Sequence, residues 1–180
     1  MRKLQEEYGG WMGDWEGIER VELRMGPAAW HHGGWKAERP LTSTGAQMSA
    51  AYVAATQIVD GEVMPRGFRH DMLERDEVWR LVGKIECVLD EGLRDEGFAT
   101  SAEVTWKDGR KARTDVKAAR GVNPELSNKE IVEKWRLLTK DVIDDDRRDN
   151  IEKTCLGIEE LDDVNILMYL LSGMTKNPIA

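Results

Sequence analysis

A pair of adjacent histidines is the first feature of the sequence that could do chemistry. His31 and His32 stand in a segment rich in Gly and Trp. Adjacent side chains project in different directions, and no Cys, Asp or Glu follows at a spacing typical of zinc sites, so we predict no metal there. Two interpretations stay open: a polar contact of a loop, or a position that faces a substrate, because histidine titrates near neutral pH.

A cluster of acidic residues resembles part of a calcium-binding loop. Asp144, Asp145 and Asp146 are followed by Asp149. The glycine that such a loop needs for its sharp turn and the glutamate that closes it are both missing. Acidic side chains also stabilise the positive N-terminal end of a helix, so we interpret these residues as a helix start.

The overall charge argues against some classes of partner. The chain has 180 residues, of which 34 are acidic and 26 basic, and its formal net charge is −8. An acidic protein is repelled by nucleic acid and by anionic membranes, which attract basic surfaces. Residues 107–120 are locally basic, but no nucleic-acid motif accompanies them, so we interpret them as a solvated hairpin face. We therefore predict neither a nucleic-acid nor a membrane partner.

The longest uncharged stretch runs from Leu41 to Val59. Its Ser, Thr and Gln side chains would need hydrogen-bond partners in lipid, so we predict a buried helix of a soluble protein. The chain contains only two cysteines, Cys87 and Cys155, which form neither a disulfide framework nor a cysteine zinc site. The reducing cytoplasm is therefore the expected location.

A helix within this stretch presents the tyrosine of greatest interest. We predict that it begins at Thr44, with Gln47 completing a capping box, and that it ends at Gly61. An apolar stripe follows the helical spacing, and a second ridge is small and polar. Tyr52 stands where the two meet. The stripe comprises Met48, Ala51, Tyr52, Ala55, Ile58 and Val59, and the ridge comprises Gly45, Ser49, Tyr52 and Thr56.

The elements around this helix predict an α+β fold with a mainly antiparallel sheet. Strands are expected over 18–25 and 85–89, a short helix over 76–82, and a long irregular loop over 26–40. Alternating runs on both sides of Asp108-Gly109 predict a hairpin with a type I′ turn.

Helical segments are expected at both ends of the chain. Residues 3–8 resemble the last turns of a helix that stops at Gly9-Gly10. After Pro124 the apolar period becomes helical, and Ser127 with Glu130 predicts a capping box. Three amphipathic helices over 126–180 form a separate element. Because its core is small, we expect it to pack against another domain or chain.

Several segments of the chain, taken together, resemble a known enzyme family. The segment from Met48 to Gly61 reads MSAAYVAATQIVDG and follows ERPL at 38–41. Further segments match in the same order: Val78-Trp79, VTWKDG at 104–109, Gly121-Val122, the 128–138 helix and Leu-Asp-Asp at 161–163. The chain thereby resembles the C-terminal part of the MmgE/PrpD family, from about Leu4 onward. The HGGW run at 32–35 looks most like the cis-aconitate decarboxylase branch, and 2-methylcitrate dehydratase comes next.

The resemblance implies an architecture and a reaction class. Family members are longer, with a helical domain interrupted by an α+β lid. Residues 1–8 would end an upstream helix, residues 9–125 would be the lid, and residues 126–180 would dock on the helical domain or in a homo-oligomer such as a dimer. The family uses no metal or organic cofactor and acts on small polycarboxylic acids of the cis-aconitate or 2-methylcitrate class.

The same resemblance nominates site residues. The family's lid tyrosine corresponds to Tyr52, which we expect to be catalytic, and we expect Arg39 and His32 to bind substrate. A core tyrosine and a structural loop anchor are the alternatives for Tyr52 and Arg39.

Two functions follow from these expectations. The first is the lid part of a cofactor-independent lyase, inactive by itself because most family catalytic residues lie in upstream segments. The second is a truncated, non-catalytic binding or assembly module.

Overall fold

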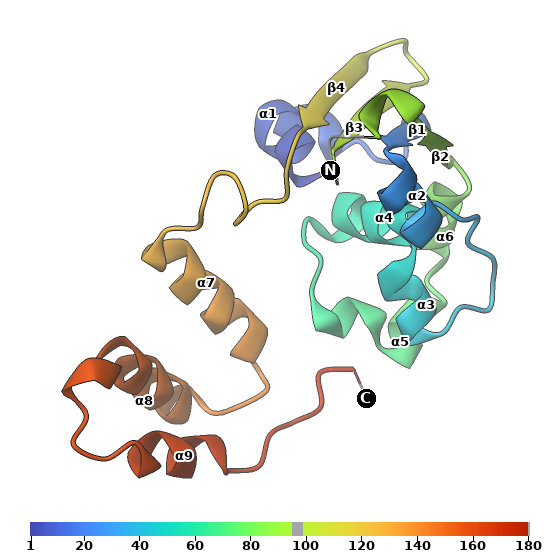
Figure 1. Cartoon of the computed structure of the whole chain (residues 1–180). Coiled ribbons are helices and arrows are strands. Elements are labelled where there is room, and N and C mark those ends of the chain that lie inside the picture. The colour runs from blue at the N-terminus through green and yellow to red at the C-terminus, as the bar shows by residue number, and fades with distance from the viewer. Residues whose placement is uncertain (95–98, 180) are drawn as a thin grey trace. The chain divides into compact units, whose positions relative to one another are not determined.

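The computed structural model describes residues 1–94 and 99–179 (Figure 1). The described residues form two compact units, one over Met1–Asn123 and one over Pro124–Pro178. None of the helices in these residues is long and apolar enough to cross a membrane. The first unit contains α1 (Arg2–Met12), β1 (Ile18–Met25), α2 (Pro27–Gly33), α3 (Ser43–Met48), α4 (Ala50–Asp60), the 3₁₀ helix η1 (Pro65–Phe68), α5 (His70–Leu73), α6 (Asp76–Val82), β2 (Ile85–Leu89), η2 (Glu91–Leu93), β3 (Thr100–Trp106) and β4 (Lys111–Val116). The second contains α7 (Asn128–Thr139), α8 (Asp145–Leu156), η3 (Ile158–Glu160) and α9 (Asn165–Leu171).

The strands of the described residues form one four-stranded sheet in the order β2-β1-β3-β4. β1 pairs with β2 in parallel and with β3 in antiparallel orientation, and β3 pairs with β4 in antiparallel orientation. The predicted α+β fold with a mainly antiparallel sheet is therefore confirmed.

The core of the first unit lies between this sheet and α4. On β1, Val21, Leu23 and Met25 are buried, and charged residues alternate with them. α4 contacts α1, α6 and β2 and runs beside the sheet (Figure 1). This packing explains why α4 carries no charge before its last residue, Asp60, because most of its other side chains are buried.

The helix expected to begin at Thr44 is interrupted, which corrects the prediction. α3 is capped by Thr42, and α4 begins anew after Ser49, whose backbone is extended at φ −88° and ψ 114°. The Ser49 hydroxyl accepts a hydrogen bond from the backbone N–H of Tyr52 at 3.2 Å, and Ser49 is fully buried. A buried serine that satisfies an N-terminal N–H stabilises a helix start, so the break coincides with the cap. The predicted end at Gly61 is confirmed, with φ at 77°.

The loop expected over 26–40 is helical in its first half. α2 begins at Pro27, whose fixed φ suits the first turn of a helix. The helix ends where Gly33 approaches the end of α3: a Cβ on Gly33 would lie 2.7 Å from the carbonyl oxygen of Met48. That close approach fixes α2 against α3, and with it the backbone of His32.

The N-terminal helix also differs from the expectation. The first helical stretch of α1 ends in a kink at Tyr8, φ −126° and ψ 32°, close to the predicted end, but a further helical stretch then continues through Gly9-Gly10 to Met12. Leu4 and Met12 are both buried in the core. Tertiary packing thus overrides the low helix propensity of two glycines.

The hairpin forms where it was predicted, but its turn is of another type. Gly109 has a φ of 87°, whereas Asp108 does not have a positive φ. The N–H of Trp106 donates to the carbonyl of Arg110, and the N–H of Gly109 donates to the carbonyl of Trp106. The loop is therefore the three-residue form, in which only the last residue is left-handed, and not the predicted type I′ turn.

The second unit consists of helices joined by caps. The predicted capping box of Ser127 and Glu130 is present at the start of α7, and Asp144 caps α8. Arg147 of α8 donates to four backbone carbonyls at and after the end of α9. These four acceptors are Leu170, Leu171, Gly173 and Met174.

Candidate functional site around Tyr52

Tyr52 lies in the first turn of α4 and is 0% exposed. Its hydroxyl donates to the carbonyl oxygen of Met72, just before the end of α5, at 3.2 Å. Oxygen–oxygen hydrogen bonds usually measure about 2.5–3.0 Å, so this one is long. The sequence had left open a catalytic and a core position, and the structure places the ring in the core with its hydroxyl against a backbone carbonyl.

Aromatic rings hold the Tyr52 ring in place. The rings of Phe68 and Trp79 lie 6.2 and 5.7 Å from it, centre to centre, and Trp79 meets it edge-on. The indole N–H of Trp79 donates to the carbonyl of Leu73 at 2.7 Å, which fixes the indole plane. Edge-on pairs of this kind are favourable because the positive edge of one ring meets the negative face of another.

Arg39 reaches this cluster through Trp79. The carbon of its guanidinium lies 5.2 Å from the centre of the Trp79 ring. Its nitrogens donate to the Asp76 carboxylate at 2.9 Å and to the Glu74 carbonyl at 3.1 Å. The structure therefore brings Arg39 and Tyr52 to one tryptophan, and these contacts are those of a loop anchor.

An ion pair supports the acceptor of the Tyr52 hydrogen bond. Arg75 and Asp60, the last residue of α4, form two parallel hydrogen bonds of 2.8 Å, with both side chains mostly buried. Nε of Arg75 also donates to the Met72 carbonyl at 3.3 Å. The Met72 carbonyl thus receives both the Tyr52 hydroxyl and Arg75. Paired planar groups of this kind fix geometry as well as charge.

Burial changes the acidity of the tyrosine. Removal from water disfavours the phenolate and raises the pKa of Tyr52 above its usual value near 10. Asp60 and Glu74 raise this pKa further, and the positive charges of Arg75 and Arg39 oppose the increase. At neutral pH the hydroxyl is protonated, so it can donate a proton but cannot act as a ready base.

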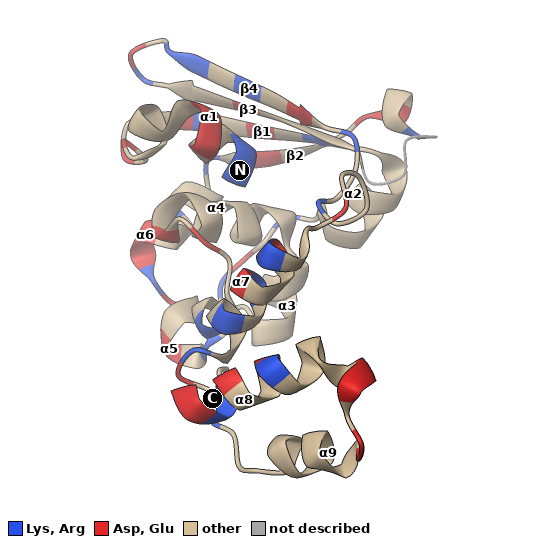
Figure 2. Ribbon diagram, turned by 90° about the vertical axis from the view of Figure 1, so that its left-hand side faces the viewer, with Lys and Arg blue, Asp and Glu red and all other residues tan. Residues whose placement is uncertain are grey.

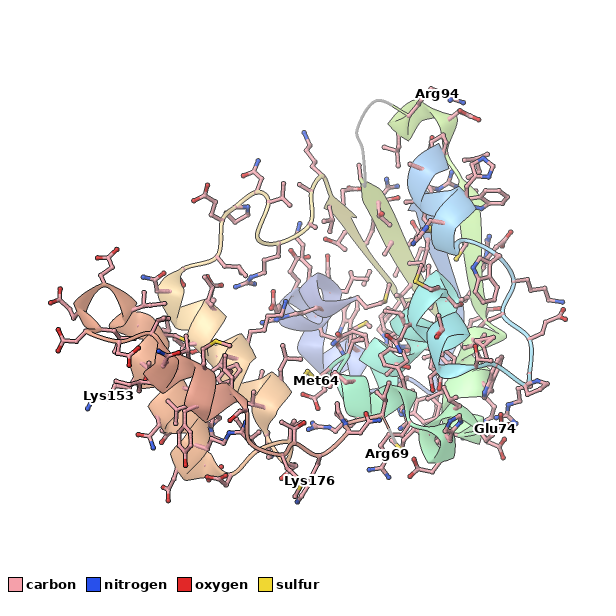
Figure 3. The ribbon with its side chains drawn as sticks, turned by 60° about the horizontal axis from the view of Figure 1, so that its bottom comes forward. Met64, Arg69, Glu74, Arg94, Lys153 and Lys176 are labelled. Carbon is pink, nitrogen blue, oxygen red and sulfur yellow. The ribbon has the colours of Figure 1, made fainter. Side chains whose placement is uncertain are left out.

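A cavity of about 190 Å³ lies beside α5, and Tyr52 is not among the residues that line it. Met72, the acceptor of the Tyr52 hydroxyl, is one of its walls, and Figure 3 labels Met64 and Arg69, which also line it. The volume is below that of pockets for drug-sized ligands, about 300–1,000 Å³, and suits a small molecule. We call it the Met72 cavity. Its lining residues are Asp60, Glu62, Met64, Arg66, Gly67, Arg69 and Met72.

Two arginines give the Met72 cavity a capacity to bind carboxylates. Arg66 pairs with Glu62, and Arg69 pairs with Asp71 through bonds of 3.0 and 2.6 Å. These pairs are exposed, and exposed ion pairs contribute only about 0–1 kcal/mol. A carboxylate ligand can therefore replace the protein partners at little cost, using the fork geometry of the guanidinium group.

Sequence reasoning missed most of this site. Arg66 and Arg69 lie three residues apart on either side of Gly67, a local signal that could have been noticed. No local pattern indicates the pairing of Asp60 with Arg75. The two residues are 15 positions apart and meet only because the segment between α4 and α6 folds back.

His32 occupies a different place. It is exposed on α2. Among the described residues, no hydrogen bond, ion pair or ring contact was found that joins His32 to Tyr52 or Arg39. Within the same residues, no group of three or more His, Cys, Asp or Glu side chains is arranged to hold a metal ion.

Comparison with known proteins identifies related sequences along most of the chain. A family model described as the MmgE/PrpD C-terminal domain matches residues 1–158. A cis-aconitate decarboxylase-like protein of Aspergillus oryzae is 37% identical over 159 residues, which cover 87% of this chain and 33% of that protein. A cis-aconitate decarboxylase of Aspergillus terreus is 34% identical over 168 residues, 90% of this chain and 34% of its own length.

The similarity extends to a mammalian enzyme. Human cis-aconitate decarboxylase is 26% identical over 145 residues, covering 78% of this chain and 30% of the human protein. The chain spans about a third of the length of these relatives.

Proposed function

Because the chain belongs to the MmgE/PrpD family, we propose that it supplies the C-terminal part of the active site of a cofactor-independent lyase. Membership confirms the resemblance carried by the MSAAYVAATQIVDG segment. We propose a small polycarboxylic acid as substrate, with cis-aconitate first because relatives at 32–37% identity bear that name. A 2-methylcitrate type of dehydration is the second choice.

We propose that Tyr52 donates the proton that the substrate carbon takes up. Decarboxylation breaks a carbon–carbon bond, releases carbon dioxide and leaves an electron pair on carbon that must take up a proton. Tyr52 is protonated at neutral pH, and its raised pKa means that it gives up this proton only to a strong base, such as the electron pair that decarboxylation leaves on carbon. Its hydroxyl donates to the carbonyl of Met72 at 3.2 Å, and Met72 lines the cavity, so a substrate in the cavity would reach the hydroxyl by displacing Met72.

The remaining groups would hold the substrate and the ring. Arg66 and Arg69 would bind its carboxylates in the Met72 cavity. Arg39, predicted to bind substrate directly, already donates to Asp76 and Glu74, so we propose that it positions Trp79 against Tyr52. Substrate binding by His32 stays a prediction.

The two units would have different roles. We propose that residues 9–125 act as the lid and that residues 126–180 dock on a helical domain or on a second copy, as in a dimer. Residues 1–8 would continue an upstream helix. A cytoplasmic location stays a prediction from the cysteine content.

The observation that carries the proposal is a protonated tyrosine whose hydrogen-bond acceptor, Met72, lines a cavity together with two arginines, in a chain of this family. A chimera tests it: residues 1–180 replace the segment that they match in a cis-aconitate decarboxylase of Aspergillus terreus, and itaconate formation from cis-aconitate is followed by chromatography. We expect turnover by the chimera and none by the purified 180-residue chain, which has about a third of the relatives' length. A folded chimera without turnover, or an active isolated chain, contradicts the proposal.

A second candidate is a non-catalytic assembly module. The observation in its favour is the exposed apolar surface of the second unit, which includes Ile166, Met168, Tyr169 and Leu171 of α9. Large exposed apolar patches usually mark interfaces. An inactive chimera together with strong self-association of the chain in sedimentation would favour this candidate.

A further inference from the structure

A second cavity, of about 390 Å³, lies at the edge strand β2. We propose that this β2-edge cavity binds a small, planar, uncharged apolar molecule. The proposal is independent of the lyase activity. The residues that line the cavity are Gly34, Trp35, Lys36, Ala37, Ala51, Trp79, Val82, Gly83, Ile85, Glu86 and Cys87.

The cavity exists because the core does not fill the end of the sheet. Ile85 and Cys87 of β2 stand opposite Val21 and Leu23 of β1. Paired residues of neighbouring strands share a face of the sheet, so all four belong to the core face. Val21 and Leu23 are buried, whereas Ile85 and Cys87 are only half-buried. Apolar surface that the protein itself leaves uncovered is thus available to a ligand.

The walls are held in place before any ligand arrives. Trp79 is fixed by its hydrogen bond to Leu73, by Arg39 over its ring and by the edge contact with Tyr52. On β2, the carbonyl of Cys87 accepts the indole N–H of Trp30 at 3.2 Å. A pocket that is already ordered binds more tightly, because little conformational freedom is lost on binding.

The segment after α2, residues 34–37, forms one wall of the cavity, and the Trp30 ring fixes the position of its backbone. A Cβ on Gly34 would lie 2.6 Å from the Trp30 ring, so the backbone at Gly34 passes directly against that ring. Trp35, Lys36 and Ala37 follow immediately and line the cavity. Trp30 therefore supports two walls, the β2 backbone and the segment over 34–37.

The lining defines the class of ligand. Two indole rings and the side chains of Ala51, Val82 and Ile85 provide apolar and aromatic surface, on which a flat ring packs well. The two charged side chains lie at the rim: those of Lys36 and Glu86 are 86% and 60% exposed, so their charges are directed to solvent and not to the cavity. The volume falls within the usual range for ligand pockets, about 300–1,000 Å³.

Cys87 provides a reporter inside the cavity. In a Cys155→Ser variant Cys87 is the sole thiol, and its alkylation by iodoacetamide is timed with and without indole as the probe. A site occupied by ligand is protected by the factor 1 + [L]/Kd, so indole at about ten times its Kd should slow alkylation about tenfold. The control is Cys87→Ser, in which the exposed Cys155 should react at the same rate with and without indole.

Gly83→Leu tests whether the protection comes from this cavity. A Cβ there would meet only the carbonyls of Arg80 and Trp79 at 3.7 Å, an ordinary contact, and the backbone is right-handed helical at φ −63°. The added side chain should fill the cavity and abolish any further slowing by indole, with an unchanged melting temperature. The proposal is overturned if indole protects Cys87 fully in the Gly83→Leu variant. It is also overturned if indole gives no protection of Cys87 in the Cys155→Ser protein that keeps Gly83. Protection by indole-3-acetate or tryptamine at tenfold lower concentration overturns the assignment of an uncharged ligand.

Discussion

Two helices of similar composition have opposite environments in this protein. α4 carries a single charged residue, Asp60 at its end, and α9 carries none, so Figure 2 draws both almost entirely in tan. Each contains one tyrosine. Tyr52 of α4 is 0% exposed, whereas Tyr169 of α9 is 80% exposed. Composition alone therefore does not determine burial.

The difference arises from what each unit offers its helix. α4 packs against a sheet and further helices, begins at the buried cap Ser49 and ends at a left-handed glycine. Within its own unit α9 contacts α8, the carboxylate of Asp163 accepts the N–H of its first residue, Asn165, at 2.9 Å, and Arg147 holds its end. α4 thus belongs to a core that holds the Tyr52 ring in one position, and α9 presents an apolar surface suited to packing.

The largest effect is expected on turnover when the two tyrosines are changed, one at a time, in the active chimera. Tyr52→Phe should lower turnover by about 100- to 10,000-fold, the usual contribution of a general acid. Tyr169→Phe removes the same atom from the exposed helix and should leave turnover unchanged. Steady-state rates of itaconate formation measure both.

Folding provides the control for this comparison. In Tyr52→Phe the Met72 carbonyl keeps Arg75 as a donor, so the loss of stability should be about 1 kcal/mol or less. Unchanged turnover with a lowered melting temperature would make Tyr52 a core tyrosine only. An equal loss of turnover in both variants would end the functional distinction between the helices.

A matched pair of isoleucines tests the difference in packing. Ile58 of α4 is 3% exposed and Ile166 of α9 is 50% exposed. Ile58→Ala should lower the free energy of unfolding by about 2–5 kcal/mol, because it leaves a cavity in the core. Ile166→Ala should change it by about 0.5 kcal/mol at most. Urea denaturation measures both values, and a large cost at Ile166 would reveal that the α9 surface is covered in solution.

A smaller effect is expected at the end of α9. Arg147→Lys keeps the charge but replaces a fork of donors that reaches four carbonyls with one compact ammonium group. We expect a loss of about 1–2 kcal/mol in the stability of the second unit, visible as faster amide exchange over α9. Lys129→Arg, on an exposed face of α7, is the control and should have no effect. Unaltered exchange in Arg147→Lys would show that the carbonyl contacts do not hold the helix.

Local patterns predicted the elements of both units but not how residues from distant segments meet. The alternation in β1 and the capping box at Ser127 are signals within a few residues, and both predictions are confirmed. The break at the buried Ser49 and the end of α2, where Gly33 meets the Met48 carbonyl, depend on packing against other segments. The site shows the same limit: Tyr52 could be singled out by its position on the helix, whereas its acceptor Met72, the pair of Asp60 and Arg75, and the cavity arise only from folding.

The smallest effect concerns pH and bears on the buried tyrosine alone. Burial raises the pKa of Tyr52 in the folded protein above the value near 10 that it has when unfolded. Below that pH the phenol is protonated in both states, and its contribution to stability is constant. As the pH rises above about 10, the unfolded chain loses this proton first, so unfolding is favoured and stability falls. Tyr52→Phe has no proton to lose, and its stability should therefore decline less steeply than that of the wild-type protein over the same range. Urea denaturation of both proteins at several alkaline pH values measures the two slopes. Equal slopes would mean that the hydroxyl is solvated in the folded protein, and the contrast between a buried α4 and an exposed α9 would then fail at the residue on which the proposed chemistry depends.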